Sequence, residues 1–228
     1  MTGVRSAAIT LQRPDTPLRF LLLPMLHLGT ADFYRDVTSQ LARCQVIVCE
    51  GVGGDSILTR ALTLAYRTPG RSKRLGLVGQ DLDYGALASA GAQIVRPDLT
   101  GEQVRRGWRT VPLVQRLAVL TLVPPFAVAF RLFGSRRVLA RYLGIEDLPT
   151  VEDHAVREAF PALTKFIVDD RDQLLVNALI SILATCAAES ILVGVVYGAE
   201  HMIATVRELA THGYRPRRAE WLTVFNFD

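Results

Sequence analysis

Polar side chains that are typical of hydrolytic sites follow four predicted strands, at the point where each strand ends. They are His27, Glu50, the pair Gln80-Asp81 and the pair Glu200-His201. In open α/β sheets, ligands bind just beyond the carboxyl ends of parallel strands. If these strands are parallel neighbours, we expect the four groups of side chains to meet at one edge of the sheet.

Histidine and carboxylate side chains are ligands of hydrolytic metal ions. A three-ligand site leaves one position open for a water molecule, and the ion lowers the pKa of that water toward neutrality. We therefore predict that His27, Glu50 and His201 hold a divalent ion such as zinc, manganese or cobalt. In a metal-free alternative, Glu50 is the general base and a histidine holds or protonates the substrate. The plainer alternatives are a structural histidine, a helix-capping Glu50 and a turn residue at Asp81.

Arg171 is a further candidate because it lies at the polar start of a long predicted helix. It is flanked by acidic residues in the run Val168-Asp169-Asp170-Arg171-Asp172. A guanidinium in this position could clamp a substrate carboxylate or stabilise an oxyanion. The alternative is an exposed arginine that pairs with the neighbouring aspartates.

The elements that must position these residues are short apolar runs separated by helical patterns. Runs of this kind indicate strands that are covered on both faces. A βαβαβ rhythm predicts an α/β fold with a mainly parallel or mixed central sheet flanked by helices. We expect one domain over residues 1–228, with a loose or edge-strand leader over 1–17. The predicted strands are 19–26, 45–50, 75–79, 93–96, 191–197 and about 219–225.

Residues 100–163 interrupt this rhythm and are predicted to be a helical insertion within the domain. Within them, Leu117–Phe130 carries no charge and contains Pro124-Pro125 at its middle. We expect the prolines to break the helix into a hairpin. Fourteen residues are too few to span a bilayer, which needs about twenty. The hairpin is either buried or lid-forming, or it contacts a membrane or partner, with Arg116 and Arg131 as anchors.

Composition narrows the partners and the compartment. The formal net charge is +4, but the arginines are scattered and carry no interleaved aromatic residues, so we expect no nucleic-acid partner. Three cysteines without CxxC spacing indicate a reducing compartment. Because residues 1–17 lack the pattern of a secretory signal, we expect a cytoplasmic protein, either free or associated with a membrane through Leu117–Phe130.

The candidate residues lie in five short segments of the chain. The segments are Met25-Leu26-His27-Leu28-Gly29, Val48-Cys49-Glu50-Gly51, Gln80-Asp81-Leu82-Asp83-Tyr84, Asp170-Arg171-Asp172 and Tyr197-Gly198-Ala199-Glu200-His201. Together they resemble the TraB/GumN/TIKI family, which is related to the erythromycin-esterase and ChaN-like fold. The resemblance covers most of the chain outside residues 100–163. The first histidine motif of the family would place glycine at position 24, where this chain has Pro24.

The resemblance implies a mixed sheet with flanking helices and metal-dependent hydrolysis of peptide or other amide or ester bonds. The substrate would be a small peptide or another small molecule. The alternative function is a non-catalytic regulatory protein that binds a ligand or peptide on the same fold. In the hydrolase, Glu50, Arg171 and His201 are expected to be catalytic, and Gln80, Asp81, Tyr197 and Gly198 to contact the substrate.

Overall fold

The computed structural model describes residues 3–51, 75–142 and 157–227, and its centre is a six-stranded mixed sheet. The strand order is β6-β4-β7-β2-β1-β8, and the first four of these strands are parallel. The predicted α/β class is therefore confirmed. The strands are β1 (Gly3–Gln12), β2 (Arg19–Met25), β4 (Val46–Cys49), β6 (Gln93–Val95), β7 (Leu192–Gly198) and β8 (Arg215–Asn226).

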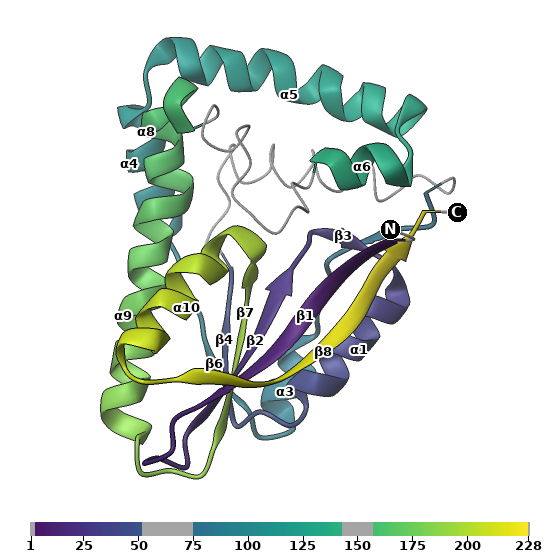
Figure 1. The fold of residues 1–228 in the computed structure, drawn as a ribbon. Coiled ribbons are helices and arrows are strands. Elements are labelled where there is room, and N and C mark those ends of the chain that lie inside the picture. The colour runs from purple at the N-terminus through teal and green to yellow at the C-terminus, as the bar shows by residue number, and fades with distance from the viewer. Residues whose placement is uncertain (1–2, 52–74, 143–156, 228) are drawn as a thin grey trace.

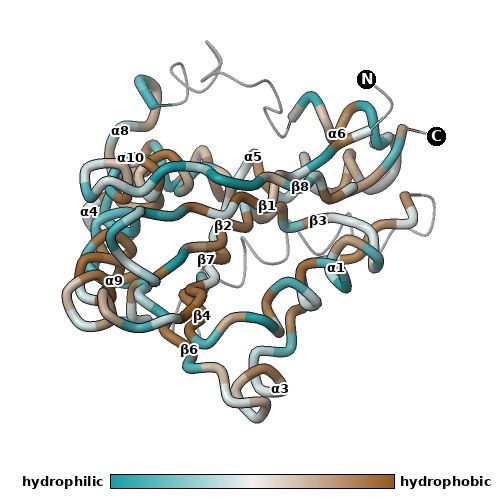
Figure 2. Tube along the Cα trace, turned by 60° about the horizontal axis from the view of Figure 1, so that its bottom comes forward, coloured by the Kyte–Doolittle hydropathy of each residue, from teal (hydrophilic) through white to brown (hydrophobic). Residues whose placement is uncertain are grey.

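Helices cover both faces of the sheet (Figures 1 and 2). One face packs against α1 (Ala31–Leu41) and α3 (Tyr84–Ser89), and the other against α9 (Asp170–Cys186) and α10 (Met202–Thr211). Strand β2 shows why its sequence is apolar throughout: Leu21 and Leu23 lie in the first core, while Phe20 and Leu22 lie in the second. A strand that is buried on both faces has no position for a polar side chain.

A second, two-stranded sheet lies beside the carboxyl edge of the large one. Its strands are β3 (Leu28–Gly29) and β5 (Val78–Gly79), which pair antiparallel. We predicted a strand of the main sheet over 75–79, which is wrong: only Val78 and Gly79 are extended, and they pair with β3. This pairing brings Gln80 next to His27, because the backbone N–H of Gln80 donates a hydrogen bond to the His27 carbonyl at 3.0 Å.

The segment predicted as a leader is instead an internal strand. Strand β1 lies between β2 and β8 and is antiparallel to both. Its buried residues include Val4, Ser6 and Ala8, which are small or polar, so no apolar run marked the strand in the sequence. The large sheet therefore contains β1, while the predicted strand over 75–79 lies outside it.

Pro24 occupies β2 without breaking the parallel ladder that β2 forms with β7. The Pro24 carbonyl accepts a hydrogen bond from the Ser6 hydroxyl of β1 at 2.7 Å, so it points toward β1. In a strand the nitrogen of the same residue points to the same side, and there the β1–β2 pairing has already ended at Leu22. The missing N–H of proline therefore costs no ladder hydrogen bond.

The predicted helical insertion contains α4 (Gly101–Thr110), α5 (Leu113–Phe133) and α6 (Arg136–Tyr142). The predicted break at the prolines is wrong, because α5 is one helix that continues through Pro124 and Pro125. Proline frees the carbonyl four residues earlier, here those of Leu120 and Thr121. Both residues are exposed, so water can hydrate these carbonyls and the helix persists.

The chain returns to the sheet through α8 (Pro161–Thr164) and a π-helical turn at Lys165–Asp169, which leads into α9. Helix α9 confirms the long helix predicted before β7. Residues 52–74 and 143–156 lie outside the described residues, so the predicted insertion is described only in part.

Thr30 fixes the start of α1 and ties it to the last strand. Its side chain accepts a hydrogen bond from the Phe33 amide and donates one to the Val224 carbonyl. We expect Thr30→Ala to lower the free energy of unfolding by about 1 kcal/mol, because an N-cap hydrogen bond is lost. Urea denaturation measures the change. Thr185→Ala, an exposed helical threonine, is the control and should leave the stability within about 0.5 kcal/mol of wild type.

Candidate functional site

Arg171 is the centre of a buried ion-pair network at the carboxyl edge of the sheet. It lies in the first turn of α9, where its Nη2 is 2.6 Å from Glu50 Oε1 and 2.8 Å from Asp98 Oδ2. Its Nε donates a second hydrogen bond to Asp98 Oδ1 at 2.9 Å. The exposed fractions are 11 % for the Arg171 side chain, 16 % for Glu50 and 0 % for Asp98. One guanidinium thus joins the residues that follow β4 and β6 to helix α9.

Glu50 is held as an anion in this network. Burial alone would raise the pKa of its carboxyl group, but the charge and hydrogen bond of Arg171, with smaller contributions from His27 and His201, hold that pKa below its usual value. The second oxygen, Oε2, accepts the Gly198 amide at 3.0 Å. A carboxylate that is stabilised in this way is a weak proton acceptor. The geometry therefore does not favour the general-base role that the sequence suggested for Glu50.

His201 and Asp172 form a second pair next to this network. His201 lies in the 3₁₀ turn Ala199–His201 after β7, and its Nδ1 is 2.6 Å from Asp172 Oδ1. Successive residues of a helix point about 100° apart, so Arg171 is directed to the carboxylates while Asp172 is directed to the histidine. The pair leaves Nε2 of His201 as the ring nitrogen for proton exchange, since an anionic Asp172 accepts a hydrogen bond from Nδ1–H.

His27 and Gln80 lie together at the end of β2. His27 is half-buried in the bend after that strand, and it contributes to the lowered pKa of Glu50. The Gln80 amide is bonded to the His27 carbonyl, as described above. The structure therefore brings four of the predicted site residues to one edge of the sheet: His27, Glu50, Arg171 and His201.

Tyr197 and Gly198, which were predicted as substrate contacts, make hydrogen bonds within the site. Tyr197 is fully buried and its hydroxyl donates to the Pro97 carbonyl at 3.1 Å, so it has no exposed surface for a substrate. It instead supports the turn that carries Asp98. Gly198 uses its amide to hold Glu50, and a Cβ there would lie 3.6 Å from both Glu50 Oε2 and His201 Cδ2.

A cavity of about 460 Å³ opens on the α3 side of this edge. Arg96 lies over the Tyr84 ring, 5.5 Å from its centroid, and the Asp83 side chain caps α3. Asp81 is exposed at the rim. Tyr84 connects the cavity to the network, because the charge of Glu50 contributes to its raised pKa, although burial is the main cause. The lining residues are Asp81, Leu82, Asp83, Tyr84, Gly85 and Arg96.

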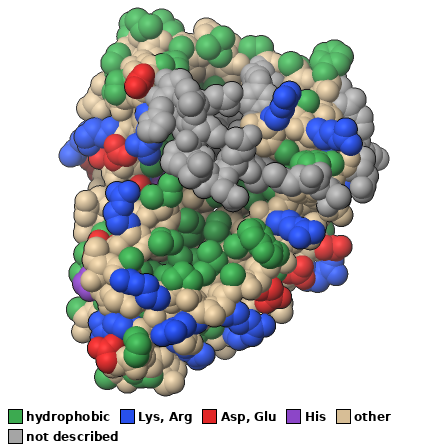
Figure 3. All heavy atoms as spheres, in the orientation of Figure 1, with side chains coloured by type: hydrophobic (Ala, Val, Ile, Leu, Met, Phe, Trp, Pro, Cys, Tyr) green, Lys and Arg blue, Asp and Glu red, His purple; other side chains and the backbone are tan. Residues whose placement is uncertain are grey.

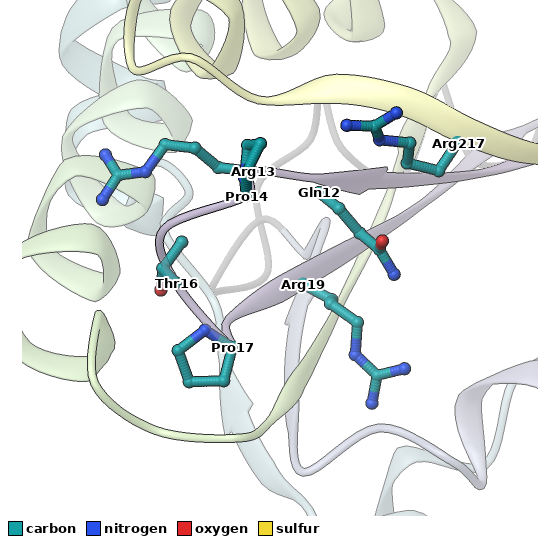
Figure 4. Close-up of a pocket in the computed structure, with 7 residues that line it drawn as sticks. All are labelled: Gln12, Arg13, Pro14, Thr16, Pro17, Arg19 and Arg217. Carbon is teal, nitrogen blue, oxygen red and sulfur yellow. The ribbon is translucent and has the colours of Figure 1, made fainter.

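Another cavity, of about 330 Å³, lies at the opposite edge, around the turn between β1 and β2. Figure 4 shows that the guanidinium groups of Arg13, Arg19 and Arg217 point in different directions there. Arg13 is paired with Asp15 and lies over the Tyr214 ring. The cavity therefore presents no converging set of charges and lies away from the carboxyl ends of the strands.

The oxygens of Glu50 decide whether a metal ion fits this site. Both oxygens of Glu50 already accept hydrogen bonds, and the Arg171 guanidinium occupies the position from which a cation would approach Oε1. Within the described ranges, no group of three or more histidine, cysteine, aspartate or glutamate side chains is arranged to hold a metal. As the side chains lie, the residues do not fit the predicted three-ligand ion.

Cys49 precedes Glu50 but is no candidate nucleophile. Burial raises the pKa of the Cys49 thiol to about 11, so the reactive thiolate is scarce at neutral pH. All three cysteines of the chain are free thiols.

Asp98 and the pairing role of Asp172 were not predicted from the sequence. Asp98 follows β6 in Arg96-Pro97-Asp98, so the strand-end rule that selected Glu50 also applies to it. Asp172 was visible only as one acid among several at the start of a helix. No sequence signal distinguished it from Asp170, which pairs with Lys165 at the surface.

The chain was compared with protein-family models, curated proteins and solved structures. No family model matches the chain, and neither a curated protein nor a solved structure matches it.

Proposed function

We propose that this protein hydrolyses peptide or other amide or ester bonds of a small substrate at the carboxyl edge of the sheet. The observation that carries the proposal is the His201–Asp172 pair, at 2.6 Å, beside the Glu50–Arg171–Asp98 network. A histidine oriented by a carboxylate is suited to general acid–base catalysis near neutral pH. The resemblance of the same segments to the TraB/GumN/TIKI family supports this activity.

His201 is the proton carrier in the proposed reaction. Its Nε2 takes a proton from the attacking water and later delivers it to the leaving nitrogen or oxygen, while Asp172 holds the ring in place. His27, at the end of β2, polarises the carbonyl oxygen of the substrate. Arg171 is committed to two carboxylates, so it is a positioning residue here and not the predicted oxyanion donor.

The 460 Å³ cavity is the proposed binding place for the part of the substrate next to the scissile bond. Asp81, Asp83 and Arg96 line this cavity, and the Arg96 guanidinium lies over the Tyr84 ring. Two carboxylates against one cation favour a neutral or positively charged group. Gln80 and Asp81 keep their predicted role as substrate contacts.

A divalent ion remains the alternative arrangement of the same side chains. Glu50 would have to exchange Arg171 for zinc, manganese or cobalt, with His27 and His201 as the other ligands. Metal analysis of the purified protein distinguishes the two arrangements. A stoichiometric ion that is lost in the His27→Gln and His201→Gln variants would establish the metal-dependent form.

The experiment for the activity is a substrate panel with neutral, acidic and basic side chains, offered as chromogenic esters and as peptides with a fluorogenic amide. We expect turnover by the wild type that persists in chelator and is absent in His201→Gln. Turnover that His201→Gln retains would contradict the proposal. Saturable binding of panel members without turnover would favour the non-catalytic ligand-binding alternative.

A further inference from the structure

Helix α5 exposes several large apolar side chains to solvent. The stretch Leu113–Phe130 is long and apolar enough to cross a membrane, and 6 % of it is buried. Figure 1 shows α5 extended along one side of the molecule, and Figure 3 shows hydrophobic side chains along the same side. Leu113, Leu117 and Leu120 follow each other at helical spacing and are 61, 51 and 48 % exposed. An exposed apolar row of this kind marks an interaction surface.

The charge of this part of the chain indicates the partner. Between Glu102 and Glu146 the sequence contains no acidic residue and no lysine, but eight arginines. Arginine stems extend along apolar surfaces while their guanidinium groups reach phosphate. Apolar side chains flanked by positive charge match an anionic lipid surface. The arginines are Arg105, Arg106, Arg109, Arg116, Arg131, Arg136, Arg137 and Arg141.

The two ends of α5 are attached to the same domain. Before it, Val104 of α4 packs with Leu99 and Phe166 in a small core. After it, Arg136 of α6 donates to the carbonyls of Leu75 and Asn226. A helix that crosses a bilayer places its flanking segments on opposite sides of the membrane. With both ends bound to one domain, α5 must lie flat along the interface.

We infer that α5 docks this protein on an anionic membrane surface, lying in the plane of the headgroups with its leucines inserted. This inference is independent of the proposed hydrolase activity, since no residue of the site lies on α5. Figure 1 shows α5 on the side of the sheet to which β2 and β7 point. Docking through α5 therefore places the carboxyl edge of the sheet on the membrane-facing side of the domain.

Flotation of the full chain with vesicles tests the inference. We expect binding to vesicles of phosphatidylcholine mixed with phosphatidylglycerol, and little binding to phosphatidylcholine alone. Leu120→Asp should weaken binding about tenfold or more, because a leucine inserted in the membrane is lost and the new negative charge is repelled by the anionic lipid. Each of Arg137→Gln and Arg141→Gln should weaken it about fivefold. Molar salt should release the protein, because the screening length then falls to about 3 Å.

Ile203→Asp is the matched control, since Ile203 is 57 % exposed on α10. It should float like the wild type, and thermal unfolding verifies that all variants are folded. Equal flotation of Leu120→Asp and Ile203→Asp would overturn the inference, as would no flotation with anionic vesicles. Resistance to carbonate extraction would overturn the flat orientation. A dimer in solution that Leu120→Asp dissociates, without vesicle binding, would assign α5 to a second copy of the chain instead.

Discussion

Arg171→Met is expected to lower the free energy of unfolding by about 3–5 kcal/mol at pH 7, because it leaves two buried carboxylates without their cation. Glu50 keeps the Gly198 amide, and Asp98 keeps the amides of Gly51 and Leu99. Arg171→Lys should recover part of the loss, since an ammonium group carries the charge but cannot bridge both carboxylates as the guanidinium does. Urea denaturation of the three proteins measures the effect.

The pH dependence of the free energy of unfolding shows whether the loss in Arg171→Met comes from the unpaired Glu50 carboxylate. In the wild type the pKa of Glu50 is lowered, so its ionisation stabilises the fold at neutral pH, and that contribution is lost as the pH falls through the folded-state pKa. Without Arg171, burial is the dominant influence and raises this pKa, so protonation of Glu50 stabilises the variant. The stability gap between wild type and Arg171→Met should therefore narrow from pH 7 toward about pH 4–5.

Arg106→Met is the matched control for the loss of an arginine ion pair. Arg106 pairs with Glu102, but the two side chains are 78 and 73 % exposed. The change should cost less than about 1 kcal/mol. If Arg171→Met costs no more than this control, or if its gap to wild type widens in acid, the network does not stabilise the fold as described.

Asp172→Asn is expected to lower kcat about 10²–10⁴-fold on any substrate that the wild type turns over. An amide N–H facing Nδ1 of His201 forces the ring proton onto Nε2, the atom that must accept a proton from water. His201→Gln should be equally damaging, and the double variant should be no worse, because the two residues act as one unit. Initial rates over a range of pH measure the loss, and the histidine limb of the kcat/KM profile should disappear in His201→Gln.

Asp170→Asn is the control for this position in the helix. Asp170 is the neighbouring acid on α9 and pairs with Lys165 at the surface. Its replacement should leave kcat and the pH profile unchanged. A comparable loss in Asp170→Asn would indicate a general effect of charge at the start of α9, and additive losses in the double variant would contradict a His201–Asp172 unit.

The parts of the fold that sequence predicted well are those with a strong local signal. Leu21, Leu22 and Leu23 form a continuous apolar run because they are buried on both faces of the sheet, and a run of this kind indicates an internal strand. Strand β1 lacked that signal because its larger buried apolar residues, Val4 and Leu11, are separated by Ser6 and Ala8. The predicted break in α5 was wrong because the helix continues through Pro124 and Pro125. The residues whose carbonyls the prolines leave unpaired, Leu120 and Thr121, are exposed.

The candidate site was predicted from the rule that polar residues after parallel strands converge. The rule selected His27, Glu50 and His201, and the structure places them at one edge. It could not assign partners, since a partner is chosen by three-dimensional packing. Asp98 and Arg171 are 73 residues apart in the chain, and nothing local in the sequence around either one specifies the other.

The long sequence separations in the Arg171 network have a consequence for folding. Its contact with Glu50 spans 121 residues, and the Glu50–Gly198 bond spans 148. Loop-closure entropy opposes contacts of such length until the segments between them are ordered. The site should therefore assemble late, only when β4, β6, β7 and α9 are together. Activity and the cooperative unfolding signal should then disappear at the same denaturant concentration, with no partly folded species that retains the site.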